Sequence, residues 1–306
     1  RNKKNILFSE HHLSHAASAY YCSPFQRSAV LTADAVGEWA TATMGVGDGR
    51  HLRILEELKF PHSVGLLYSA FTAFLGFEVN DGEYKVMGMG AYGEPKYVDK
   101  VGKLINLAPD GSFQLDLNYF SFPNSTRHMF NSRFEDLFGK PRSASESNNL
   151  EPYYAELAAS VQQVTEDILI KMARHLRQRT GETNLCMAGG VALNGLANHR
   201  IAREAGFDGV YIQPAAGDAG GALGAALWAY HDVLGNEREF QMRHSYWGAE
   251  TSDREISDYL NTAGISFWEA TNEDQIIEHV VESLSQGKVV GWYQGRAEWG
   301  PRALGN

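Results

Sequence analysis

Residues 8–20 read Phe-Ser-Glu-His-His-Leu-Ser-His-Ala-Ala-Ser-Ala-Tyr and carry the densest potential chemistry in the chain. The leucine and alanines among the histidines predict a helix over Glu10–Tyr21, which follows a short apolar run, Ile6–Ser9, that reads as a strand. In such a helix His11 and His15 leave the same face about one turn apart. This spacing suits metal chelation, but a pair of structural histidines explains it too, because an i,i+4 pair without supporting carboxylate ligands is a weak signal.

A second apolar run predicts a buried strand that ends at a carboxylate. The run Ser28–Ala33 is followed by Asp34 and then by a turn containing Gly37. In α/β folds, ligand-binding groups often follow the carboxyl ends of buried strands. Asp34 is therefore a candidate ligand-binding residue.

A glycine pair follows the next candidate buried strand, Asn184–Ala188. Gly189 and Gly190 form the turn, and a helix from about Leu193 carries Asn194. Glycines at such a turn let a phosphate or ribose approach the backbone at the positive end of a helix. A single Gly-Gly turn also occurs in proteins that bind no nucleotide.

A second glycine-rich turn follows a strand over Gly209–Gln213 and opens a helix that runs to about Leu234. Asp218 lies in this turn. Two interpretations fit Asp218 equally well at this stage: it is a ligand-binding group, or it is the N-cap of the helix.

A polar segment, Asn80–Gly93, contains Glu83 and Lys85 together with four glycines. It fits either a surface turn or a loop close to a ligand. The remaining patterns predict a β-hairpin of Trp39–Val46 with His51–Leu58, and a late strand over Gly287–Tyr293. They also predict four helices, Ser63–Leu75, Pro152–Arg179, Asp253–Asn261 and Glu273–Gln286. Leu104–Asn149 is expected to be an irregular peripheral insertion with short strands.

The composition is that of an ordinary globular α/β protein. The chain has 306 residues, 43% of them hydrophobic, and a formal net charge of -10, which argues against a nucleic-acid partner. Its two cysteines form no disulfide framework, and no apolar run approaches the roughly 18 residues that span a membrane. We expect a cytoplasmic protein without a membrane partner. Because the chain lacks an initial Met and stops within a glycine-punctuated motif, we interpret it as a fragment of a longer protein.

Taken together, the motifs resemble the NodU/CmcH type of O-carbamoyltransferase over nearly the whole chain. Those that carry the resemblance are His11-x-x-x-His15 with Asp34, Lys85-Val-Met-Gly, Gly189-Gly-Val-Ala-Leu-Asn194, Gly217-Asp218-x-Gly-Gly and Gly295-Arg-Ala-Glu-Trp-Gly-Pro-Arg-Ala-Leu-Gly305.

The resemblance implies an α/β architecture of two domains. Residues 1–240 would be a metal- and adenylate-binding carbamoyltransferase domain with an actin/hexokinase-like (ribonuclease-H-like) ATPase fold, whose amino-terminal segment is missing. Residues 249–306 would begin a YrdC-like α/β domain that forms carbamoyl adenylate. The boundary is expected between Asn236 and Gly248.

The resemblance also implies roles for individual residues. The implied metal ligands are His11, His15, Asp34 and Asp218. The family implies iron(II), although two imidazoles and two carboxylates also suit manganese or zinc. The implied cofactor contacts are Gly189, Gly190 and Asn194 for adenylate, and Arg296, Glu298 and Arg302 for the second active site, where guanidinium groups suit phosphates.

Two further assignments stay open. His12 is a candidate general base, although a buried or solvent-facing structural histidine fits as well. Glu83 and Lys85 are candidates for lining the acceptor or adenylate pocket.

The implied activity is that of a metal-dependent O-carbamoyltransferase. Carbamoyl phosphate and ATP would give carbamoyl adenylate, whose carbamoyl group passes to a hydroxyl of a small-molecule or glycan acceptor. The alternatives are a tRNA threonylcarbamoyl-transferase-like protein, which the acidic balance disfavours, and a noncatalytic nucleotide-binding fragment. Neither the acceptor nor the oligomeric state can be inferred from the sequence.

Overall fold

In the computed structural model, which describes residues 6–143 and 151–305, the chain divides into two units, Arg1–Met242 and Arg243–Asn306. The functional assignment of the two predicted domains, 1–240 and 249–306, stays a prediction. Within the described residues, no helix has both the length and the apolar character needed to cross a membrane.

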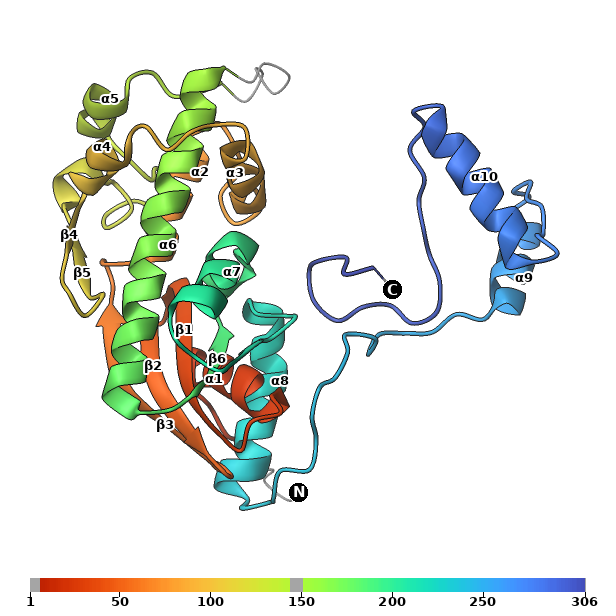
Figure 1. The fold of residues 1–306 in the computed structure, drawn as a ribbon, viewed down its shortest axis with the longest axis horizontal. Helices are drawn as coiled ribbons and strands as arrows, with labels where there is room; N and C mark the ends of the chain where they lie inside the picture. Colours follow the sequence, from red (N-terminus) through yellow and green to blue (C-terminus); the bar gives the residue numbers. More distant parts are fainter. Residues whose placement is uncertain (1–5, 144–150, 306) are drawn as a thin grey trace. The chain divides into compact units, whose positions relative to one another are not determined.

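A mixed five-stranded sheet forms the centre of the first unit (Figure 1), so the predicted α/β class is confirmed. Its strand order is β3-β2-β1-β6-β7, with β1, β2 and β3 antiparallel and β6 and β7 parallel to β1. The strands are β1 (Arg27–Gly37), β2 (Ala40–Asp48), β3 (His51–Lys59), β6 (Asn184–Ala188) and β7 (Gly209–Ile212).

Alternate side chains of the central strands enter two different cores. Leu31 and Met187 are neighbours in the pairing of β1 with β6, and both belong to the larger core. Val30 and Cys186 are also neighbours, and both belong to a smaller core on the opposite face. Since successive side chains of a strand point to opposite faces, the central strands are apolar on both sides and must be covered on both.

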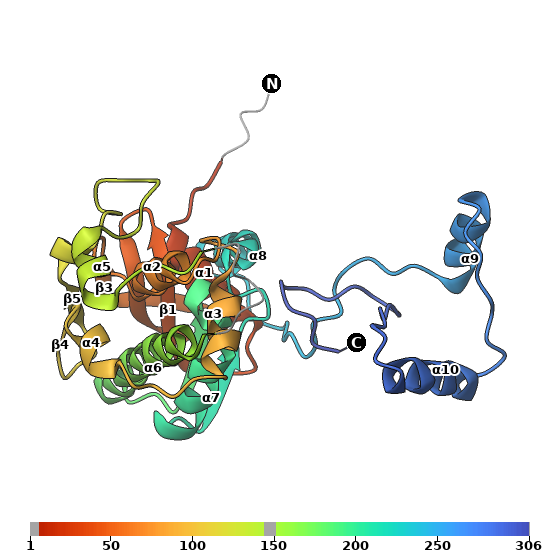
Figure 2. The same ribbon diagram turned by 90° about the horizontal axis from the view of Figure 1, so that it is seen from above.

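Helices cover both faces of the sheet. Residues of α2 (Val64–Phe74) and α6 (Pro152–Thr180) form the larger core with the strands, and α1 (His11–Cys22) forms the smaller one. Figure 1 shows α6 lying across the sheet, and both views show α7 (Gly195–Glu204) beside it (Figures 1 and 2). Helix α8 (Asp218–Trp228) packs against α1 and continues as a π-helical turn, Ala229–Val233.

The insertion after residue 104 belongs to the core, so its predicted peripheral position is wrong. Phe134 and Phe138 are fully buried, and each of their rings packs against that of Phe71, at 5.1 Å between ring centroids. The segment contains the predicted short strands, and residues 144–149 of the predicted insertion lie outside the described residues. Its elements are α4 (Val98–Gly102) just before it, β4 (Ile105–Leu107), β5 (Phe113–Leu115), a 3-10 turn (Leu117–Tyr119) and α5 (Ser132–Phe138).

Three other expectations about local structure differ from the result. Ile6–Ser9 forms no strand, and its apolar side chains are exposed. The predicted loop Asn80–Gly93 contains helix α3 (Glu83–Gly90), because Val86 and Met89, three residues apart, are buried on one face. Gly287–Tyr293 forms no strand either, and most of its residues are exposed.

The second unit contains two capped helices. Helix α9 (Asp253–Thr262) begins with a capping box between Ser252 and Glu255, and helix α10 (Glu273–Ser285) is capped by the side chain of Asn272. The backbone near Glu250 pairs with that near Arg296 through an isolated antiparallel bridge.

Helices α1 and α8 approach unusually closely at Gly224. A Cβ at this position would lie 1.8 Å from the carbonyl oxygen of Ser14, so only glycine fits. The contact joins the first turn of α1 to the middle of α8, and Asp218, at the start of α8, lies beside His11 and His15.

We expect Gly224→Ala to lower the free energy of unfolding by at least about 1–3 kcal/mol, the usual cost of overpacking, because the two helices must separate. Gly221→Ala, in the same helix, is the matched control, because its Cβ would meet nothing within 4 Å and alanine favours the helix. Urea unfolding of both variants checks this expectation. Equal stabilities would show that the close contact does not limit the packing of the two helices.

Candidate functional site

Four side chains from three elements converge at one point of the first unit. Each of His11, His15, Asp34 and Asp218 offers one atom, and these atoms all lie within 4.8 Å of one another. Nε2 of His15 lies 2.9 Å from Oδ2 of Asp34 and 3.0 Å from Nε2 of His11. Oδ1 of Asp218 lies 3.4 Å and 3.5 Å from the same two nitrogens. The structure thus brings together the four residues that the sequence analysis grouped.

Asp34 reaches this point because β1 is irregular there. The pairing of β1 with β2 shifts between Ala33 and Gly37, so Asp34 lies in the irregular stretch. Its Oδ1 accepts a hydrogen bond from the N–H of Ala35, at 2.7 Å, which leaves Oδ2 facing the two histidines.

Helix α2 holds the backbone of Asp34. The hydroxyl of Ser63, the N-cap of α2, donates to the Asp34 carbonyl at 3.0 Å and accepts from the N–H of Leu66. A Cβ on Gly65 would lie 2.6 Å from the same carbonyl oxygen. The sequence did not reveal this contact, because nothing local links residue 63 to residue 34.

Asp218 occupies the first position of α8, and Gly217 is the N-cap. The structure gives no side-chain capping bond at this helix start, so the interpretation of Asp218 as an N-cap is wrong. Its side chain is 80% exposed and faces the histidines from the solvent side.

The environment favours an ionised Asp34. Burial works to raise the pKa of its carboxyl, but hydrogen bonds from His11 and His15 outweigh it and bring the pKa well below its usual range. The pKa of His11 is raised, chiefly by its hydrogen bond with Asp34, against the effect of burial.

The donor set fits a divalent cation. Only one of the two facing Nε2 atoms can donate a proton to the other, whereas a cation between them would satisfy both nitrogens and both carboxylates. The separations of 2.9–3.5 Å among the ring nitrogens and carboxylate oxygens match the roughly 3 Å expected between adjacent ligands of a six-coordinate ion with bonds of about 2.1 Å. Imidazole with carboxylate suits iron, manganese or zinc.

His12 points away from this cluster into the interior. Its Nε2 lies 3.0 Å from the carbonyl oxygen of Ala40 and must donate, so its Nδ1 accepts from the hydroxyl of Thr32 at 2.7 Å. Burial is the main cause that lowers the pKa of His12 to about 4. Both ring nitrogens are engaged, and this arrangement favours the structural alternative for His12 over the general base.

The Gly189–Gly190 turn lies directly beside the cluster. Gly189 has φ = 96°, and a Cβ there would lie 2.2 Å from the Ala33 carbonyl oxygen, so the turn needs glycine. A Cβ on Gly190 would lie 2.9 Å from Oδ1 of Asp34. The backbone of Gly190 therefore lies next to the Asp34 carboxylate.

Asn194 supports this turn from its other end. It caps α7 by accepting from the N–H of Ala197, and its side-chain amide exchanges two hydrogen bonds of 2.9 Å with Gln162 of α6. The hydroxyl of Tyr68 donates to the same Gln162. Most of the hydrogen-bonding capacity of Asn194 is used inside the protein, a role that the sequence pattern did not reveal.

The other predicted site residues have contacts of their own. Glu83 accepts hydrogen bonds from the Ser69 hydroxyl, at 2.7 Å, and from the N–H of Asn80, which places its carboxylate at the start of α3. Lys85 is exposed, and its Nζ lies 5.6 Å from the ring centroid of Tyr84. The structure gives neither residue a contact with the four-residue cluster.

Within the second unit, Nε of Arg296 lies 3.7 Å from Oε2 of Glu250. The carboxylate of Glu298 accepts from the N–H of Leu304 at 2.7 Å, and Arg302 lies in the bend before it.

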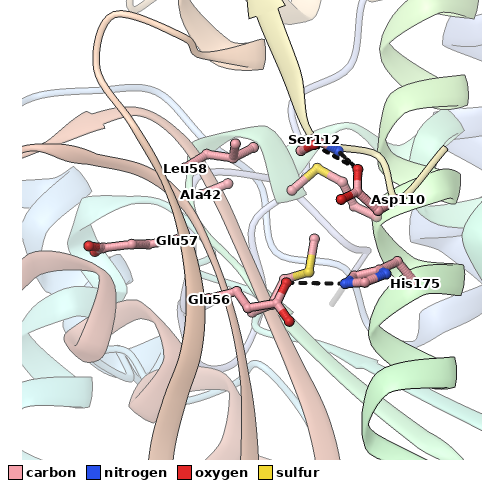
Figure 3. Close-up of a pocket in the computed structure, with 9 residues that line it drawn as sticks. Ala42, Glu56, Glu57, Leu58, Asp110, Ser112 and His175 are labelled. Carbon is pink, nitrogen blue, oxygen red and sulfur yellow. Dashed lines mark hydrogen bonds and ion pairs between the residues drawn. The ribbon is translucent and has the colours of Figure 1, made fainter. Parts of the chain in front are cut away.

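Two hollows of the first unit lie elsewhere, on the sheet edge and between helices. Figure 3 shows the smaller, a cavity of about 70 Å³ in which His175 of α6 and Glu56 of β3 pair at 3.1 Å. The larger, of about 470 Å³, lies beside α4, α6 and α7. The described residues that line these two hollows do not include His11, His15, Asp34 or Asp218.

Comparison with known families decides the family of the chain. A model of the carbamoyltransferase N-terminus matches residues 1–227, and a model of the carbamoyltransferase C-terminus matches residues 281–306. The chain belongs to the carbamoyltransferase family. The predicted resemblance is confirmed.

Relatives of this carbamoyltransferase chain include uncharacterized protein sll1178 of Synechocystis, which is 48% identical over 98% of the chain and 49% of its own length. Nodulation protein NolNO of Sinorhizobium fredii is 35% identical over 98% of the chain and 42% of its own length. The 3'-hydroxymethylcephem-O-carbamoyltransferase of Streptomyces clavuligerus is 28% identical over 99% of the chain and 54% of its own length. The chain spans about half the length of these relatives.

Among solved structures, T. kodakarensis HypF is similar with a TM-score of 0.39 and 15% identity, over 76% of the chain and 38% of its own.

The hydrogen bonds beneath the cluster yield a stability prediction. The Thr32 hydroxyl is hydrogen-bonded both to Nδ1 of His12 and, at 2.6 Å, to the hydroxyl of Thr43. Thr32→Val therefore removes the hydrogen-bond partner of His12 Nδ1 and of the Thr43 hydroxyl. We expect a loss of about 1–3 kcal/mol in the free energy of unfolding, the usual cost of buried unpaired groups. Urea unfolding measures it.

Thr72→Val is the matched control for Thr32→Val. Thr72 is equally buried, but its hydroxyl donates to the Tyr68 carbonyl inside helix α2, which keeps its helical hydrogen bond. The control should be close to neutral. Equal losses in the two variants would contradict the role assigned to Thr32.

Proposed function

We propose that this carbamoyltransferase chain supplies the metal- and nucleotide-binding part of an enzyme that transfers a carbamoyl group to a hydroxyl acceptor. The observation that carries the proposal is the convergence of two imidazoles and two carboxylates in a member of this family. The proposed donor is carbamoyl adenylate, made from carbamoyl phosphate and ATP. The proposed acceptor is a small molecule or a glycan.

The proposed metal ligands are Nε2 of His11 and His15 and one oxygen each of Asp34 and Asp218. Iron(II) is the proposed ion. A divalent cation bound there would act as a Lewis acid that stabilises negative charge on the phosphate or carbamoyl oxygens. The ionised state of Asp34, which its hydrogen bonds favour, prepares the site for a cation.

The nucleotide is proposed to lie against the turn at Gly189 and Gly190. Support comes from the closeness of Gly190 to Asp34, because the same ligand could then reach both the backbone of Gly190 and the carboxylate cluster. Asn194, whose side chain is occupied by Gln162, would hold this turn in place rather than recognise adenine through its full amide.

In the proposed transfer, the acceptor oxygen forms a bond to the carbamoyl carbon while the bond from that carbon to the phosphate oxygen breaks. AMP leaves, and the hydroxyl proton passes to a base or to solvent. His12 is not proposed as this base, because both of its nitrogens are engaged.

Residues 249–306 are proposed to begin the domain that makes the adenylate, with Arg296, Glu298 and Arg302 at its phosphate site. The actin/hexokinase-like assignment of residues 1–240 is part of the same proposal, and the mixed five-stranded sheet flanked by helices supports it.

We expect the purified chain, prepared without chelators or a histidine tag, to contain about one equivalent of divalent metal, as a four-ligand protein site does. His15→Ala should lose it, because this nearly buried imidazole faces both carboxylates. Elemental analysis by mass spectrometry identifies and counts the ion.

His199→Ala is the control for this measurement, since it removes an exposed histidine of α7 outside the cluster and should leave the metal content unchanged. Absence of metal from the wild-type chain after incubation with iron(II), manganese and zinc would refute the metal site. Metal that persists in His15→Ala would refute the ligand assignment.

A further inference from the structure

The loop between β1 and β2 is fixed beside the cluster. It consists of Glu38–Trp39, between the paired residues Gly37 and Ala40. The backbone of Gly37 lies against the ring of His11, because a Cβ there would be 2.1 Å from the ring carbon Cδ2. On the other side of the loop, His12 donates to the Ala40 carbonyl. Two adjacent residues of α1 thus hold both ends of the loop.

Glu38 is strained in this loop. Its φ of 59° lies in the left-handed region, which two-residue hairpin loops normally fill with glycine or asparagine. Non-glycine residues in such conformations concentrate at functional sites, where the fold offsets their cost. The exposed carboxylate is close enough to His11 that its charge adds to the larger effect of the Asp34 hydrogen bond in raising the pKa of that imidazole.

Trp39 offers a large apolar surface at the same place. Its indole makes an edge-on contact with Phe60, at 6.4 Å between ring centroids, and its backbone carbonyl accepts a hydrogen bond of 2.8 Å from the Phe60 N–H. Trp39 is nevertheless 71% exposed. One exposed aromatic residue is ordinary, but this one follows Glu38 in a loop whose two ends contact His11 and His12.

We propose that Glu38 and Trp39 form the acceptor-binding wall of the site and select ring-shaped polyols that are neutral or cationic. The indole would stack on the apolar face of the ring, and the carboxylate of Glu38 would accept hydrogen bonds from hydroxyls or ammonium groups at its edge. Glu38 is not among the proposed metal ligands, so a bound cation would leave its negative charge free to disfavour anionic rings. The inference rests on the proposed function for the identity of the bound group as the acceptor.

Ligand-observed NMR titration of the whole chain, without carbamoyl donor, tests the wall. Methyl glucoside, glucosamine and glucuronate are matched pyranoses that are neutral, cationic and anionic. The wild-type chain should bind the first two and bind glucuronate more weakly. Trp39→Ala should weaken binding of all three by roughly tenfold, the scale of an aromatic stacking contact.

Trp268→Ala is the matched control, since Trp268 is also exposed, at 54%, but lies in the second unit. It should leave the three affinities unchanged. Failure of the wild-type chain to bind any of the three sugars, or unchanged binding in Trp39→Ala, would overturn the proposal.

Two substitutions separate the charge of Glu38 from its backbone strain. Glu38→Gln should bring the affinities for glucosamine and glucuronate together with little change in Tm. Glu38→Gly should do the same but raise Tm, because glycine adopts the left-handed conformation freely. A Glu38→Gln chain that still discriminates between the two sugars would overturn the role of the charge.

The outcome for the wall is distinguishable from that for carbamoyl transfer. Trp39-dependent sugar binding without any transfer activity would count against the proposed function only. Transfer to an acceptor that proceeds equally well in Trp39→Ala would count against the wall only.

Discussion

The close packing of α1 against α8 and the sheet is the constraint on which the candidate site depends. The two helices meet where Gly224 faces the Ser14 carbonyl, with no room for a side chain. This contact places the start of α8, and with it Asp218, opposite the first turn of α1. A larger separation would remove one carboxylate from the cluster and leave the two histidines facing Asp34 alone.

Strand β1 links this helix pair to the rest of the protein. One face of the strand packs on the smaller core with α1, and Leu31 on the other face packs in the larger core. Where the strand becomes irregular, Asp34 turns toward the histidines and α2 holds its carbonyl through Ser63. The same strand continues into the loop that carries Glu38 and Trp39. The residues of β1 that pack in the two cores are therefore followed directly along the chain by residues of the candidate site.

Much of the fold could be predicted from local patterns. The helix of the histidines, the β1 and β6 strands, the hairpin and the long helix α6 all follow from hydrophobic periodicity and turn residues. The predictions failed where a pattern was short or depended on a distant partner. Helix α3 was hidden by its glycines, and the phenylalanines around Phe134 gave no local sign that they complete the core with α2.

The sequence by itself determined that His11 and His15 share one helix face, because four residues make about one helical turn. It also determined that Asp34, the Gly189–Gly190 turn and Asp218 each follow or open a regular element. Only the tertiary structure decided that these groups meet, since they come from helices and strands that are as much as 207 residues apart, from His11 to Asp218. It also decided that His12, the immediate neighbour of His11, faces the interior and pairs with Thr32, because adjacent residues of a helix point in different directions.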